Sequence, residues 1–278
     1  IIEIEKIAKS KNKVVNIGIR LNPNTNAQTI SQISTGKKEN KFGVDQKIFL
    51  QLVDYLKNSN FLSLKCLSVH IGSQILNHKP YQSMLKVVDK IIKKSNHNFE
   101  YVDLVGGMGI DYAHDNSKLS LKQYSLNIQK ILKNYNCKVI FEPGRSIIGN
   151  AGILITKILY IKEGYKKDFI ILDAAMNDLM RPALYGAQHK IIPSKKTKKT
   201  SKKSYEFVGP ICESTDKFRL IKKFQKLEEK GIVVICDVGA YGTSLASNYN
   251  VRPKPIEILI KGSKIQVIRK RQKLSELV

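Results

Sequence analysis

The sequence has 278 residues, with 48 Lys and Arg against 23 Asp and Glu, which gives a formal net charge of +25. This length can bury a large core in one or two domains, and no apolar run approaches the ~18 residues that cross a membrane. The positive charge is almost entirely lysine, and its densest run, "SKKTKKTSKKS" (194–204), holds no aromatic residue that could stack on a base. We therefore predict neither a membrane partner nor a specific nucleic-acid partner.

The first half of the chain alternates between two periodicities. Apolar, strand-like runs are separated by stretches with apolar residues at three- and four-residue spacing, which is typical of amphipathic helices. This alternation predicts parallel βαβ units. The expected strands are 14–21, 65–72, 101–105 and 138–142, and the expected helices are about 44–58, 79–95 and 120–135, after an amphipathic helix at the start.

From about residue 147 the pattern changes to shorter β-like runs separated by turn residues. Examples are "ILITKILYI", "FIILDA", "GIVVICDVG" and "IEILI", and helical periodicity is confined to about 215–230. We expect a mostly β second domain at 148–278. No internal repeat is evident.

Polar or glycine-rich segments follow the predicted strands of the first half: "HIGSQ" (70–74), "GGMG" (106–109) and "EPGR" (142–145). Each taken singly fits an ordinary structural histidine or a turn. In a (β/α) barrel, however, the C-terminal ends of the strands build the active site. Their shared position therefore favours a functional site.

One cysteine stands apart from the other three. Cys66, Cys137 and Cys236 lie in or beside apolar runs, where a small buried thiol is ordinary. Cys212 instead precedes Glu213 in "VGPICESTD" (208–216). Cysteine is usually buried and glutamate usually exposed, so this pair does not fit a simple core pattern. The cysteines form no metal-binding spacing, so we expect reduced thiols, a cytoplasmic protein and no metal.

Long blocks in family order make the chain recognisable. It resembles the diaminopimelate decarboxylases, within the alanine-racemase-like group of pyridoxal-phosphate decarboxylases. The blocks are "ISTGKKENKFGV", "HIGSQ", "GGMGI", "EPGRSIIGNAG", "MNDLMRPALYGA", "GPICEST" and "DVGAYGTSLASNYNVRPKP". The resemblance implies an α/β fold in which 1–147 are the last four strands of an eight-stranded (β/α) TIM-type barrel that binds pyridoxal phosphate, followed by the β domain. It also implies a homodimer with shared active sites.

The resemblance assigns cofactor and substrate roles. Glu142 would face the pyridinium nitrogen and keep the ring an electron sink, while His70 would stack on the ring. The remaining cofactor-binding residues are Ser73, Gly107, Gly144, Arg145 and Tyr241. The implied substrate-binding residues are Arg145, Arg181, Tyr185, Glu213 and Tyr241, where guanidinium groups suit a carboxylate.

The family also explains the cysteine beside Glu213. After CO₂ leaves, the substrate carbon must be reprotonated, and in the family the cysteine of "CES" reaches in from the neighbouring subunit to donate that proton. A thiol suits this task because its proton is labile near neutral pH. Cys212 is therefore the predicted catalytic residue, and Glu213 would bind the distal ammonium of diaminopimelate.

Two departures from the family pattern stand out. Val105 occupies the first position of the usual three glycines, which restricts the backbone there. The lysine that carries pyridoxal phosphate lies upstream of the region that matches Ile1, and Lys37, Lys38 and Lys41 belong to another block. We therefore expect an N-terminally incomplete chain that is inactive alone.

The predicted activity is decarboxylation of meso-2,6-diaminopimelate to L-lysine. Two alternatives remain open at this point: a related decarboxylase acting on ornithine, arginine or carboxynorspermidine, and a decarboxylase-like binding protein without activity. "CES" with "MNDLMRPALYGA" argues against the first, and the retained Cys212, Glu142, Arg145 and Tyr241 argue against the second.

Overall fold

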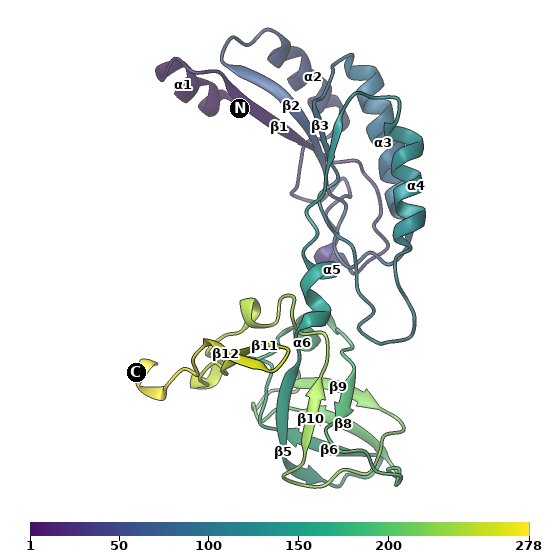
Figure 1. The fold of residues 1–278 in the computed structure, drawn as a ribbon, viewed down its shortest axis with the longest axis vertical. Coiled ribbons are helices and arrows are strands. Elements are labelled where there is room, and N and C mark those ends of the chain that lie inside the picture. The colour runs from purple at the N-terminus through teal and green to yellow at the C-terminus, as the bar shows by residue number, and fades with distance from the viewer. Residues whose placement is uncertain (278) are drawn as a thin grey trace. The chain divides into compact units, whose positions relative to one another are not determined.

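The computed structural model describes residues 1–277, which divide into two compact units (Figure 1). Unit 1 comprises residues 1–111 and 116–146, and unit 2 comprises residues 112–115 and 147–277. The short segment 112–115 thus belongs to the second unit although it lies within the first half of the sequence.

Unit 1 contains a four-stranded parallel sheet. The strands are β1 (Val15–Leu21), β2 (Leu62–Val69), β3 (Tyr101–Asp103) and β4 (Lys138–Ile140), which pair in sequence order. All three pairings are parallel. The predicted βαβ alternation is confirmed, and each strand lies within or close to the range expected from the sequence.

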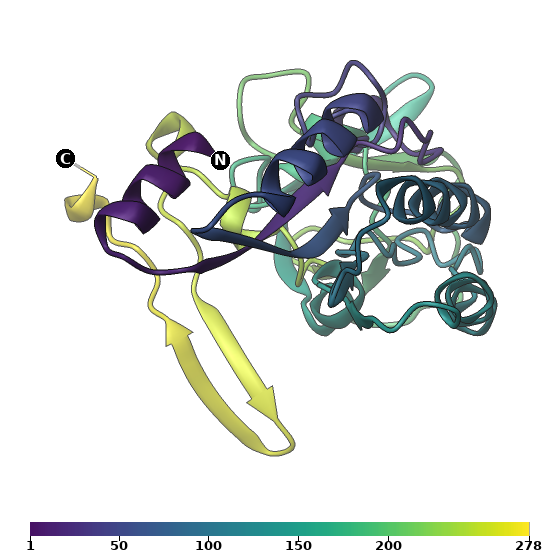
Figure 2. The ribbon, with the colours of Figure 1, turned by 90° about the horizontal axis from the view of Figure 1, so that it is seen from above.

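Three longer helices of unit 1 lie along the sheet (Figures 1 and 2). Each of the three begins at a capping side chain. Asp45 accepts hydrogen bonds from the N–H groups of Lys47 and Ile48, at 2.8 and 2.9 Å, and so satisfies two donors that a helix start leaves unpaired. The side chains of Asn77 and Ser120 cap the next two helices in the same way. The helices are α1 (Ile2–Ser10), α2 (Gln46–Lys57), α3 (His78–Ser95) and α4 (Leu121–Leu132). The short α5 (Arg145–Ile148) begins in unit 1 and ends in the first residues of unit 2.

The core of unit 1 is one cluster between the sheet and the helices. Leu67 of β2, Phe49 of α2 and Met84 of α3 are completely buried in it. These positions are the apolar stripes that the sequence periodicity identified. Packing this core aligns the strands, and their C-terminal ends carry the predicted site residues.

Unit 2 is mostly β, as predicted. Its six-stranded sheet has the order β7-β10-β5-β6-β8-β9, in which only β6 and β8 pair in parallel. A separate hairpin forms a two-stranded ribbon (Figure 2). The strands are β5 (Leu154–Lys162), β6 (Lys167–Leu172), β7 (Ile191–Pro193), β8 (Ser204–Val208), β9 (Lys217–Ile221), β10 (Ile232–Ile235), β11 (Glu257–Lys261) and β12 (Lys264–Arg269).

Helical content in unit 2 is small. It comprises α6 (Arg181–Tyr185) and four 3-10 turns, at Gly149–Ala151, Thr243–Leu245, Tyr249–Val251 and Leu274–Glu276; a further 3-10 turn, Ser31–Ile33, lies in unit 1. The helical periodicity read at 215–230 is wrong, because Lys217–Ile221 form β9. Antiparallel pairing with β8 overrides the local pattern there. None of the helices within residues 1–277 is long and apolar enough to cross a membrane.

Candidate active site

The loops that follow the strands of unit 1 are fastened to one another by backbone hydrogen bonds. Ile75, after β2, donates to the carbonyl of Gly107 at 2.9 Å, and Gly109, after β3, donates to Ile75 at 3.0 Å. Ser73 donates its backbone N–H to Ile33 at 3.0 Å, so the block that begins "ISTG" joins the same group of loops. Three sequence blocks that are far apart are therefore fixed at one edge of the sheet.

A cradle of hydrogen-bond donors lies among these loops. The buried Arg145 donates from Nη2 to the Ser73 hydroxyl oxygen at 2.9 Å. Gly107 has φ +92°, and a Cβ placed on it would lie 2.2 Å from the carbonyl oxygen of Gly72. A Cβ placed on Gly144 would have no neighbouring atom within 4 Å. A guanidinium, a hydroxyl and side-chain-free backbone are the groups that bind a phosphate.

His70 follows β2 directly and stays neutral. Burial, and secondarily the nearby positive charge of Arg20, lowers its pKa to about 4, although Asp103 acts in the opposite direction. An uncharged imidazole at the strand ends is suited to stacking on a flat aromatic ring. Glu142, after β4, lies close enough to Arg20 for its carboxylate to favour the charged guanidinium.

Val105 has a left-handed backbone, with φ +52°. This conformation is a genuine outlier for a β-branched residue, and it occurs at the position where the family pattern has a glycine. The Asp103 carboxylate accepts the Val105 N–H at 2.8 Å, and the Glu142 N–H donates to the Val105 carbonyl at 2.7 Å. The turn shape is therefore held by hydrogen bonds despite the side chain.

In unit 2 the loop between β8 and β9, residues 209–216, carries the predicted proton donor. The buried Asp216 carboxylate accepts the N–H of Ile211 at 2.8 Å and the N–H of Met176 at 2.7 Å. Burial raises the pKa of Asp216, and these two N–H groups oppose the rise. Gly209 packs on the same carboxylate, and a Cβ there would lie 2.2 Å from it. This carboxylate thus joins "GPICEST" to "MNDLMRP".

The loop presents its two functional side chains outward. Cys212 is an exposed free thiol, whereas burial raises the pKa of Cys66, Cys137 and Cys236. The Glu213 carboxylate accepts hydrogen bonds from the Thr215 hydroxyl and, at 2.9 Å, from Tyr249 Oη. These two bonds lower the pKa of Glu213, so it is an anion at neutral pH.

The remaining predicted substrate residues of unit 2 lie on α6 and on the loop 237–242. Arg181, at the start of α6, is 3% exposed, and Tyr185 ends the same helix half-buried. Tyr241 is half exposed with φ +59°. Its loop packs on residues 149–152, where the N–H of Gly239 donates to the Gly149 carbonyl at 3.0 Å.

The predicted residues therefore form two groups, one in each unit. The group of unit 1 is His70, Ser73, Gly107, Glu142, Gly144 and Arg145, and that of unit 2 is Arg181, Tyr185, Cys212, Glu213 and Tyr241. Among the residues that shape these groups, sequence reasoning missed Arg20, Asp216 and Tyr249. The only signal for Asp216 was its position at the end of the cysteine block.

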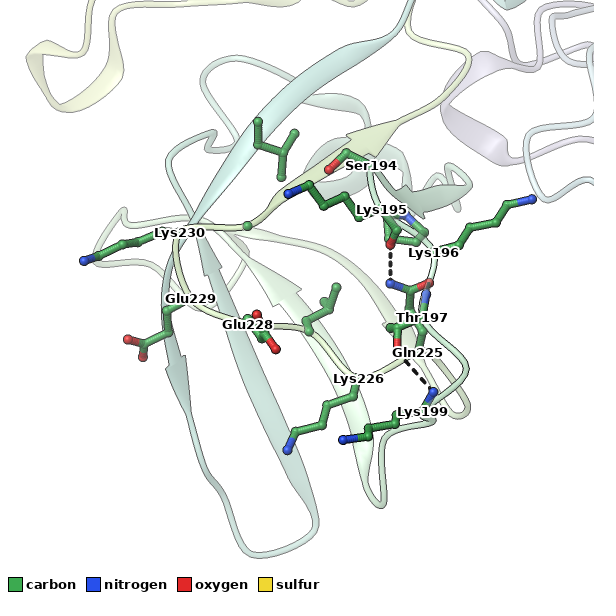
Figure 3. Close-up of a pocket in the computed structure, with 14 residues that line it drawn as sticks. Ser194, Lys195, Lys196, Thr197, Lys199, Gln225, Lys226, Glu228, Glu229 and Lys230 are labelled. Atoms are coloured by element: carbon green, nitrogen blue, oxygen red, sulfur yellow. Dashed lines mark hydrogen bonds between the residues drawn. The ribbon is translucent and has the colours of Figure 1, made fainter.

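A pocket of about 460 Å³ lies elsewhere in unit 2, between 193–199 and 225–232 (Figure 3). Lysines and the carboxylates of Glu228 and Glu229 line it. Gln225 closes one side by donating to the Lys195 carbonyl at 2.6 Å. None of the predicted site residues lines this pocket, which includes part of the lysine run.

The residues of unit 1 fit pyridoxal phosphate. The cradle of Arg145, Ser73 and Gly107 suits the phosphate, and the neutral ring of His70 suits a face of the pyridine. The carboxylate of Glu142 is of the chemical type that would pair with the ring nitrogen. A parallel α/β unit with these groups at its strand ends defines a pyridoxal-phosphate-binding protein.

Comparisons with known proteins agree. The family model "Pyridoxal-dependent decarboxylase, pyridoxal binding domain" matches residues 1–149. The diaminopimelate decarboxylase of Helicobacter pylori is 41% identical, covering 99% of this chain and 68% of that protein. That of Zymomonas mobilis is 38% identical, covering 99% and 66%. The chain spans about two thirds of the length of these curated relatives.

Solved structures give the same result. The crystal structure of the Helicobacter pylori diaminopimelate decarboxylase complexed with L-lysine has a TM-score of 0.90 at 40% identity, covering 98% of this chain and 68% of that one. The diaminopimelate decarboxylase of M. jannaschi has a TM-score of 0.88 at 34% identity, covering 99% and 65%. The chain belongs to the diaminopimelate decarboxylase family of pyridoxal-dependent decarboxylases. The predicted α/β fold, with part of a TIM-type barrel followed by a β domain, is confirmed.

Proposed function

We propose that the protein containing this chain decarboxylates meso-2,6-diaminopimelate to L-lysine and CO₂, using pyridoxal phosphate. The observation that carries the proposal is the loop 209–216, which presents an exposed thiol at Cys212 beside an ionised carboxylate at Glu213. The relatives that cover nearly the whole chain carry the same activity in their names.

The residues of unit 1 would hold the cofactor. Arg145, Ser73 and Gly107 would bind the phosphate, His70 would pack against the ring without adding charge, and Glu142 would keep the ring nitrogen protonated. When bound, pyridoxal phosphate supplies the electron sink that makes loss of CO₂ feasible. The side chains themselves contribute orientation and charge.

The residues of unit 2 would act on the substrate. Arg181 binds a carboxylate, Tyr185 and Tyr241 line the site, and Glu213 accepts the distal ammonium. Cys212 holds a proton on Sγ and donates it to the carbon that has lost CO₂. Because the family places this cysteine in the neighbouring subunit's site, we also propose a cytoplasmic homodimer with shared active sites.

The test of the chemistry is Cys212→Ala in the full-length protein. Turnover should fall roughly 10²–10⁴-fold, the usual scale for a positioned acid, while pyridoxal phosphate binding measured by absorbance stays unchanged. Cys137→Ala, at a half-buried thiol beside β4, is the matched control and should retain turnover. Near-normal turnover of Cys212→Ala would contradict the assigned role.

The test of the substrate is Glu213→Ala. Processing of diaminopimelate should weaken more than pyridoxal phosphate binding, because the substrate ammonium loses its partner. If the intact protein prefers ornithine, arginine or carboxynorspermidine, the substrate assignment is wrong. If it binds pyridoxal phosphate and releases CO₂ from none of these compounds, it is a binding protein.

We also propose that residues 1–278 alone are inactive, because none of Lys37, Lys38 and Lys41 matches the family's cofactor lysine. Borohydride reduction in the presence of pyridoxal phosphate should yield no adduct at a single lysine by mass spectrometry. A defined adduct together with decarboxylation by residues 1–278 would contradict this proposal.

A further inference from the structure

Arg181 is held by a second buried side chain, His189, which no sequence motif identified. Both residues are nearly inaccessible, with 3% and 1% of their surfaces exposed. Arg181 Nη1 lies 2.7 Å from His189 Nε2. The other ring nitrogen, Nδ1, lies 2.8 Å from the carbonyl oxygen of Cys236 at the end of β10.

These two contacts determine the protonation of the imidazole. A guanidinium nitrogen can only donate, so Nε2 must accept and carries no proton. A carbonyl oxygen can only accept, so Nδ1 must carry the proton and donate it. His189 is therefore a neutral imidazole in one tautomer, and its plane is fixed by a hydrogen bond at each nitrogen.

An aromatic ring supports the same guanidinium from another direction. Arg181 Cζ lies 4.1 Å from the centroid of the Tyr112 ring, within cation–π range. The His189 ring meets that Tyr112 ring edge-on, with centroids 4.7 Å apart and planes at 63°. The N–H of Lys190 donates to the Tyr112 carbonyl at 3.0 Å, which fastens the segment 112–115 beside His189.

A fixed guanidinium matters because a planar carboxylate is bound by parallel N–H groups only when the two planes match. A flexible arginine would lose rotamer freedom on each binding event. His189 occupies one N–H of Arg181 and Tyr112 covers its face, so the remaining donors keep a defined direction. The loop of Cys212 is tied to the same region through Asp216 and Met176.

We propose that His189 is a positioning residue for Arg181, with Tyr112 as its support, and that it sets the affinity for the substrate carboxylate. The inference rests on the proposed function for the identity of that substrate. His189 itself contacts no reacting atom. Its effect should therefore fall on substrate binding and leave the chemical step nearly unchanged.

The experiment compares His189→Leu, His189→Gln and His97→Leu in the full-length protein loaded with pyridoxal phosphate. His97 is a matched control, because its Nε2 contacts the Leu64 carbonyl at 2.9 Å and its ring meets Phe99 edge-on, with centroids 4.8 Å apart. Within the described residues 1–277, no guanidinium is bonded to His97. His189→Leu should raise KM for diaminopimelate about 10–100-fold with kcat within a few-fold, the scale of a lost hydrogen bond to a charged group.

His189→Gln should restore most of the affinity, since an amide can accept from Arg181 and donate to Cys236 at once. His97→Leu should leave KM unchanged. An unchanged KM in His189→Leu, or an equal rise in His97→Leu, would overturn the inference. If His189→Leu does not fold, the KM values of His189→Gln and His189→Asn are compared instead. The Asn variant should have the higher KM, because its shorter amide cannot reach both partners, and equal KM values would overturn the inference.

A readout that needs no turnover separates this inference from the proposed function. The Arg181 side-chain N–H signals, assigned by their loss in Arg181→Lys, should show hindered rotation by NMR in the wild type and averaging in His189→Leu. If the wild type fails to decarboxylate diaminopimelate but the signals behave this way, the proposed function is wrong and the positioning role stands. Equal signals in both proteins would refute the positioning role.

Discussion

The depressed pKa of His70 makes stability depend on pH in a defined direction. Burial and the charge of Arg20 lower the pKa from about 6.5 in the unfolded chain to about 4 in the folded one. Between these values the unfolded chain binds a proton at His70 that the folded chain does not. The free energy of unfolding therefore falls as the pH falls through this window, and the loss is complete below pH 4.

The magnitude follows from the same two values. A shift of about 2.5 pH units corresponds to roughly 3 kcal/mol in total, and about 2 kcal/mol of it is lost between pH 7.5 and 5. The assay is urea unfolding at pH 7.5, 6 and 5 without pyridoxal phosphate, on the wild type and on His70→Gln. The variant lacks the titrating ring, so its stability should fall by about 2 kcal/mol less over that range.

A direct measurement accompanies the unfolding curves. The His70 ring signals, assigned by their absence in His70→Gln, are followed by NMR from pH 7.5 to 4. A midpoint near 4 supports the burial argument, because only the folded environment distinguishes this ring from a free imidazole. A midpoint of 6 or above, or identical pH dependence in both proteins, would refute the reasoning.

Three further predictions concern the backbone and one buried carboxylate. Val105→Gly should be more stable than Val105→Ala by about 1–2 kcal/mol, the reverse of the usual order, because only glycine relieves the left-handed φ; a more stable alanine variant in urea unfolding would contradict this. Gly107→Ala should cost roughly 1–3 kcal/mol and weaken pyridoxal phosphate binding, measured by titration, while Gly144→Ala, with open space at its Cβ, should cost much less in stability. Asp216→Ala should cost roughly 2–4 kcal/mol by leaving the buried N–H groups of Ile211 and Met176 without an acceptor; a thermal melt that matches the wild type would show that water replaces the carboxylate.

The sequence predicted the features that depend on local pattern. The strands and helices of unit 1 follow from apolar periodicity, and side chains such as Asp45 mark where helices begin. The strand ends drew attention to His70 and Ser73 because a parallel sheet collects them at one edge. The resemblance then supplied roles that position alone could not.

What the sequence could not predict depends on pairing between distant segments. The sequence of β9 has a helical pattern, but the segment is a strand because it pairs with β8. The left-handed backbone of Val105 is held by hydrogen bonds to Asp103 and Glu142. No sequence motif marks His189, because its hydrogen bond to Cys236 joins residues 47 apart in sequence. Such contacts have no local signature because the whole fold must form before they exist.

The membership of residues 112–115 in unit 2 has a practical consequence for dividing the gene. The chain enters the second unit twice, so the two units are not two consecutive stretches of codons. A pair of plasmids that splits the reading frame near codon 147 would leave Tyr112 on one polypeptide and Arg181 and His189 on the other. Fragment complementation would then have to restore the contacts of Tyr112 with Arg181 and His189 between separate chains. A gene division that keeps codon 112 with the second fragment would leave these contacts within one chain.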